Sequence, residues 1–263
     1  MPLVREMVTE VVTETATMEI ALPVLGIALA VFVAGMVVTG SGSASGLRTA
    51  ALALALGIVC IHIRDGGWLT GADRTITSGL AAHPRAGFDH LATVGIALGA
   101  PAGAIAGAAV AGLVLIRCGA PVPVASTVLG AVMVAVFGAA ALDTVPGPGR
   151  VVAGVRHTVD TETLVQSNLA GTVTALGMAA VIVGIGRNRT LRALLAAAVA
   201  AAVVALAGAR LYVGMPLTEV VADVLVAAMC LTVGHAVLAA FASRVPPATL
   251  GAVSGPGFVP TPG

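Results

Sequence analysis

Polar side chains in the second half of the chain gather in three clusters beside long apolar runs, at 143–150, 166–168 and 210–223. An arginine side chain offers a planar fork of donors that matches the oxygens of a phosphate. Polar groups at the ends of apolar helices are the arrangement that a membrane protein acting on a lipid headgroup would use. The clusters therefore predict contact with a lipid headgroup, and Arg150 and Arg210 are the candidate cations for a phosphate.

The charged residues of these clusters also have structural interpretations. Arg210 follows Arg192 by eighteen residues, roughly 27 Å along a helix, so the two also suit anchors at opposite interfaces of one span. Asp143 can form a salt bridge with one of the cluster arginines. Asp223 lies inside an apolar run, so we expect it to pair with Arg210 or Arg150, or to serve proton or cation transfer.

The remaining polar residues in and between the clusters leave further alternatives open. Glu219 suits the positive end of a helix dipole. His157 stands in the loop between the first two clusters, either as a displaced nucleophile or as a solvated residue. Ser167, beside Gln166 and Asn168, is expected to cap the helix that follows, because no neighbouring base is visible that would activate it.

Histidines and cysteines show no metal-ligand spacing, and no metal or cofactor is expected. The cysteines are too scattered for a disulfide framework and are interpreted as packing residues. His235 is expected to hydrogen-bond to a neighbouring helix. The residues concerned are Cys60, Cys118, Cys230, His62, His90 and His235.

The composition places the chain in a membrane. Its 263 residues are 58% hydrophobic and 10% charged, whereas soluble domains carry about 25% charged residues. Only 3% are aromatic, which argues against an outer-membrane barrel, and a net charge of +1 provides no basic surface for nucleic acid. The absence of lysine and the abundance of alanine and valine are typical of GC-rich genomes such as those of actinobacteria.

Apolar runs of about twenty residues predict an all-α, polytopic transmembrane bundle of about seven spans. The predicted spans are 18–39, 47–63, 90–116, 121–142, 167–186, 190–213 and 217–241. Residues 1–17 form an amphipathic segment, and 18–46 an additional first span with its loop. Residues 47–241 form the membrane core, and 242–263 a flexible tail rich in proline and glycine. We expect the first span to be retained, because its acidic leader does not suit a signal peptide.

Charge distribution predicts the orientation in the membrane. With alternating spans, one side holds all twelve acids and the other holds arginines alone, at 48, 117, 187, 189, 192 and 244. The positive-inside rule makes the arginine side cytoplasmic. The polar clusters are therefore expected to face outward from a bacterial cytoplasmic membrane.

The third predicted span contains a repeat of small residues at Gly99, Gly103 and Gly107. Small residues at four-residue spacing let helices approach closely, so the repeat predicts a packing face. Pro101 lies inside the repeat and predicts a kink in the span.

The order of these motifs resembles the type-2 phosphatidic acid phosphatase superfamily, in which a six-helix core would correspond to residues 47–241. The resemblance begins at 68–73 (WLTGAD) and 88–95 (FDHLATVG). Its first motif corresponds to 143–151, where Arg150 is kept and Asp143 replaces a lysine. The second corresponds to 166–169, where Ser167 is kept and Leu169 replaces a histidine. The third corresponds to 209–220, similar through Arg210 and its Tyr212 run.

The residues that depart from the family motifs are the catalytic ones. Family chemistry uses one histidine as nucleophile, a second as acid and a carboxylate that orients the first. Leu169 occupies one histidine position, and Met215 or Pro216 the other; Glu219 or Val220 stands at the carboxylate position. The resemblance therefore implies a decayed member without ordinary catalysis.

Two roles are consistent with a decayed site. In the first, we expect the protein to bind a lipid phosphate or a polyprenyl-type carrier in a pocket at the acidic ends of the spans. In the second, we expect it to serve as an accessory subunit with a membrane-protein partner. The candidate pocket residues are Asp143, Arg150, Gln166, Ser167, Asn168, Arg210, Tyr212, Glu219 and Asp223. The alternatives are an active lipid-phosphate phosphatase with rearranged residues, in which His157 would be the nucleophile, and a small transporter using Asp223.

Overall fold

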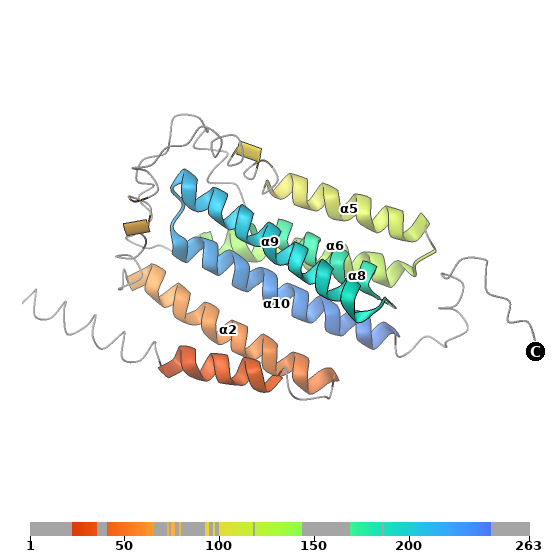
Figure 1. Ribbon diagram of the computed structural model, residues 1–263, viewed down its shortest axis with the longest axis horizontal. Helices are drawn as coiled ribbons and strands as arrows, with labels where there is room; N and C mark the ends of the chain where they lie inside the picture. Colours follow the sequence, from red (N-terminus) through yellow and green to blue (C-terminus); the bar gives the residue numbers. More distant parts are fainter. Residues whose placement is uncertain are drawn as a thin grey trace, which may run out of the picture.

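The computed structural model describes residues 23–35, 41–65, 73, 75–76, 79, 93–94, 97, 100–117, 119–143, 169–185 and 187–242. Within these ranges the regular structure is entirely helical, which confirms the all-α prediction. The first helix is Pro23–Gly35. It is followed by α2 (Ser41–Asp65), α5 (Pro101–Arg117), α6 (Val122–Asp143), α8 (Leu169–Gly184), α9 (Arg189–Val213) and α10 (Leu217–Ala242), which lie side by side along the long axis (Figure 1).

Four of these helices are long and apolar enough to cross a membrane. They are α2, α6, α9 and α10, with spanning stretches at Ala44–Ile61, Val122–Leu142, Arg189–Val213 and Leu217–Phe241. They coincide with the second, fourth, sixth and seventh predicted spans, and α2 begins six residues earlier than predicted. The first helix, α5 and α8 are apolar but shorter, at 10–17 residues each. The described chain therefore has the composition and helix lengths of a membrane protein.

The pairs α5 and α6, α8 and α9, and α9 and α10 run antiparallel, because three or four residues join the two helices of each pair. Gly119 and Gly214 adopt left-handed backbone conformations in the turns between α5 and α6 and between α9 and α10. The Ser45 hydroxyl, near the start of α2, donates to the carbonyl of Thr232 late in α10, so α2 also runs antiparallel to α10. One end of the bundle consequently gathers the start of α8, the end of α9 and the start of α10, which we call the acidic end.

The opposite end, which we call the arginine end, gathers the described arginines at 48, 117, 187, 189 and 192. Among residues with described placement no acid lies there. The acids with described backbone lie at the acidic end, at 65, 73, 143, 219 and 223. This separation along the bundle follows directly from the alternating helix directions.

The short helix α8 lies at the centre of the bundle and packs against α5, α6, α9 and α10. Its residues Leu169, Thr174 and Met178 are fully buried. A Cβ atom added at Gly171 would stand only 2.5 Å from the Val136 side chain of α6, so glycine is required for this close approach. Burial among other helices also explains why α8 need not match the full thickness of a bilayer.

Two expectations for the third predicted span are wrong. Pro101 does not kink a helix, because it opens α5 in the first turn, where its missing N–H needs no partner. The buried face of α5 consists of Ala104, Ala108 and Gly112, whereas Gly103 and Gly107 are exposed. The packing face is thus shifted by one residue from the predicted glycines, because spacing alone does not say which face meets the bundle.

Candidate functional site: a buried charge pair at the acidic end

Arg210 lies in the last turn of α9 and is only 1% exposed. The turn is closed by Gly214, whose left-handed conformation lets the following N–H of Met215 donate to the carbonyl of Arg210 at 3.1 Å. The chain then reverses into α10 within three residues. This tight reversal holds the buried guanidinium against the first turns of α10, where it pairs with a side chain of the protein.

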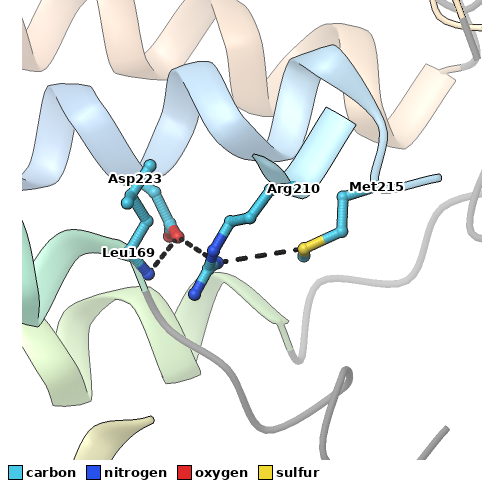
Figure 2. A network of polar contacts seen from close by, with 4 residues as sticks. All are labelled: Leu169, Arg210, Met215 and Asp223. Atoms are coloured by element: carbon cyan, nitrogen blue, oxygen red, sulfur yellow. Dashed lines mark hydrogen bonds and ion pairs between the residues drawn. The ribbon is translucent and has the colours of Figure 1, made fainter. Parts of the chain in front are cut away.

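Asp223 on α10 is the anion that meets this guanidinium. Its Oδ2 atom lies 3.2 Å from Nη1 of Arg210 and accepts a hydrogen bond of 2.8 Å from the backbone N–H of Leu169 (Figure 2). The Asp223 side chain is 16% exposed. One of the two partners expected for Asp223 is therefore confirmed, and the contact is between neighbouring helices.

The shared oxygen joins three helices at one point. Leu169 is the first residue of α8, where backbone N–H groups lack partners within the helix and the dipole favours a negative charge. Nη1 of Arg210 also lies 3.9 Å from the sulfur of Met215. A carboxylate held between an arginine and a helix N-terminus has the surroundings of a bound anion, here supplied by the chain itself.

A buried carboxylate at the acidic end, that of Asp73, was missed by the sequence analysis. Asp73 is 8% exposed and accepts hydrogen bonds from the backbone N–H of Thr218 at 3.1 Å and from its hydroxyl at 2.8 Å. It thereby caps the N-terminus of α10 from a distant part of the chain. Asp73 belongs to the WLTGAD stretch, but nothing in the sequence pointed to a partner 145 residues away.

We expect Asp73→Ala to lower the free energy of unfolding by about 1 kcal/mol, because a first-turn N–H of α10 then loses its acceptor. Thermal unfolding in detergent, followed by circular dichroism, measures the loss. Glu219→Gln, in the same turn of α10, is the comparison. A melting temperature of Asp73→Ala equal to that of the native chain would contradict the capping role.

The other candidate residues divide into two groups. Tyr212 is buried in the last turn of α9, Glu219 is half-buried in the first turn of α10, and Asp143 ends α6 at the same end. Arg150, His157, Gln166, Ser167 and Asn168 lie outside the described residues. The described chain thus brings together Arg210, Tyr212, Glu219 and Asp223 at the acidic end, with Arg210 and Asp223 in direct contact.

The acidic end offers a charge pair without a visible set of catalytic groups. Within the described ranges no three His, Cys, Asp or Glu side chains gather as a metal site, and Cys60 and Cys230 are free thiols. Comparison of the chain with family models, curated proteins and solved structures finds no match. The geometry around Asp223 is accordingly the main guide to function.

Proposed function

We propose that this chain is a seven-span, non-catalytic protein of a bacterial cytoplasmic membrane, which acts as an accessory subunit of a membrane assembly. Its core would be a decayed form of the six-helix phosphatase core, with the acidic end facing outward. The observation that carries the proposal is the position of Asp223. Its carboxylate occupies the space between Arg210 and the N-terminus of α8, where the resemblance expects a phosphate to bind.

Electrostatics oppose a phosphate in the same place. Two like unit charges about 4 Å apart repel by roughly 4 kcal/mol at an effective dielectric near 20. A phosphate at Nη1 of Arg210 and the N–H of Leu169 would meet this repulsion from Asp223, which already accepts from both groups. The Arg210–Asp223 pair therefore favours a structural role for Arg210. Lipid-phosphate binding by Arg210 is the second candidate function.

Turnover is tested directly with purified protein in detergent. We expect no phosphate release above background from phosphatidate or from a polyprenyl pyrophosphate, because the two histidine positions of the motifs hold residues without a titratable group. The matched control is His157→Ala. Release by the native chain that this substitution abolishes would contradict the proposal and would assign the nucleophile to residue 157.

The accessory role is supported by an exposed face of small residues on α5. Gly103 and Gly107 are exposed, and a Cβ atom added at Gly107 would meet nothing within 4 Å. Figure 1 shows α5 at the edge of the bundle, beside α6. Faces of this kind bring transmembrane helices into close contact, so α5 is the helix that we expect a partner to cover.

A photo-crosslinking residue at Val110, which is 62% exposed on α5, tests this contact in cells. We expect one discrete protein adduct, which Gly107→Leu abolishes because the larger side chain separates the helices. The same crosslinker at Val204 on α9, 71% exposed, serves as the lipid-facing control and should give no such adduct. An adduct that is identical at both positions, or that survives Gly107→Leu, would contradict the accessory role.

A further inference from the structure

A groove with a volume of about 490 Å³ lies between α8 and α9 in the half of the bundle that carries the arginine end. Its walls come from the second half of α8 and the first half of α9, which run antiparallel, and His235 of α10 also lines it. Most of the lining side chains are apolar. The lining includes Gly177, Val181, Gly184, Arg192, Val199 and His235.

The groove exists because small residues face each other across it. Ala180 and Gly184 on α8 oppose Ala196 and Ala200 on α9, whereas Gly177 packs against Leu231 of α10 at the edge of the space. In addition, α9 packs mainly on α8 and contacts α10 only slightly, so no side chain of α10 other than His235 lines the space. The result is a long apolar hollow of the size that small-molecule sites have, about 300–1,000 Å³.

Arg192 supplies a positive charge to this apolar groove. The aliphatic part of its side chain lies close to Gly184, because a Cβ atom added there would be 3.3 Å from Cγ of Arg192. The residue is exposed, and its side chain makes no hydrogen bond or ion pair with any part of the chain that the structure describes. The guanidinium is therefore available to an anion at the arginine end.

His235 places a second polar group deeper along the same groove. It lies seven residues before the end of α10, about 10 Å from that end, and is exposed. Polar side chains at this depth in a membrane helix face a cavity or a polar partner, because contact with hydrocarbon is costly. Its ring makes no hydrogen bond with the described residues, and His235 lines the groove, so we expect the ring to face that space.

We propose that this groove binds an anionic phospholipid, with the lipid phosphate at Arg192, an acyl chain along the apolar walls and a lipid oxygen at His235. The charges favour this occupant, because the described arginine end carries five arginines and no acid. Apolar walls favour a lipid over a free anion. The inference rests on the membrane location of the bundle and not on the accessory role proposed for α5.

Native mass spectrometry of the protein in nanodiscs that contain phosphatidylglycerol and phosphatidylethanolamine tests the site. We expect Arg192→Gln to lower the retained phosphatidylglycerol about tenfold, as the loss of one charge-assisted hydrogen bond predicts. Ala196→Phe, which fills the groove, should lower it to a similar extent. The matched controls are Arg189→Gln and Ala197→Phe, two exposed positions of α9 outside the groove, and both should retain the lipid.

Three outcomes would overturn the inference. Equal losses in Arg192→Gln and Arg189→Gln would show attraction by charge alone. Retention of the lipid in Ala196→Phe would place it outside the groove, and displacement by millimolar inorganic phosphate would show an anion site without a lipid. None of these outcomes depends on the crosslinks from α5, so this inference and the accessory role can fail separately.

Discussion

Arg210→Met should lower the free energy of unfolding by about 3–5 kcal/mol, the largest effect that we expect from any single exposed or buried charge in the bundle. The substitution leaves the carboxylate of Asp223, which still accepts from the N–H of Leu169, without the guanidinium of Arg210. Removing one partner of such a pair costs more than the pair itself contributes, because the remaining charge is uncompensated. Unfolding in mixed micelles of increasing denaturing detergent measures the difference.

Arg189→Met is the matched control for this experiment. Arg189 lies on the same helix, is exposed, and its side chain makes no hydrogen bond or ion pair with the described residues, so its loss should cost less than about 1 kcal/mol. Equal and small losses in both variants would contradict the structural role of Arg210.

Cysteine labelling should separate the two ends of the bundle completely. In a chain whose three native cysteines are replaced by alanine, Asp160→Cys should react with an impermeant maleimide in intact spheroplasts. Arg187→Cys should react only after the membrane is permeabilised, because the arginine end is expected to be cytoplasmic. Position 187 is used because the neighbouring Asn188 caps α9 by accepting from the N–H of Leu191.

Ala135→Cys provides the buried control, since Ala135 is fully enclosed on α6 and should react in neither condition. Reaction of positions 160 and 187 from the same side of the membrane would contradict the seven-span orientation. Reaction of 187 alone from outside would invert it.

The helical architecture could be predicted from the sequence because hydropathy is a local property. Each of the seven apolar runs overlaps one helix that the structure describes, but only α2, α6, α9 and α10 are long enough to cross a membrane. The third span was predicted to begin at residue 90, because the apolar run is continuous from there through Pro101. In the structure α5 begins at Pro101, and hydropathy alone does not mark that helix start.

Contacts between distant residues could be predicted only in part. An acid within an apolar run needs a partner, which correctly suggested a pair for Asp223, but the sequence could not choose between Arg210 and Arg150. The tight reversal at Gly214 places Arg210 beside Asp223, because it brings the end of α9 to the start of α10, whereas Arg150 lies outside the described residues. Asp73 could not be found at all, since a capping carboxylate in a connecting segment has no periodic signal.

The glycine repeat shows the same limit in another form. Spacing at Gly103 and Gly107 indicates a face suited to close packing, but the surface that it meets is set by the whole bundle. Within the described chain the adjacent face, through Ala104 and Ala108, packs inward instead. The repeat is therefore the surface on which the partner proposed above would pack.

The central claim, that Asp223 takes the place of an external phosphate beside Arg210, is tested most directly by a double-mutant cycle. Arg210→Met, Asp223→Asn and the double variant are compared by unfolding and by the lipid that remains bound after purification. We predict a coupling energy of at least about 1 kcal/mol, because in the double variant the new amide oxygen can still accept from the N–H of Leu169 and no charge is left unpaired. Bound lipid should be unchanged in all three. Additive losses of stability, together with loss of an anionic lipid from Arg210→Met alone, would show that the arginine serves a phosphate and would contradict the account.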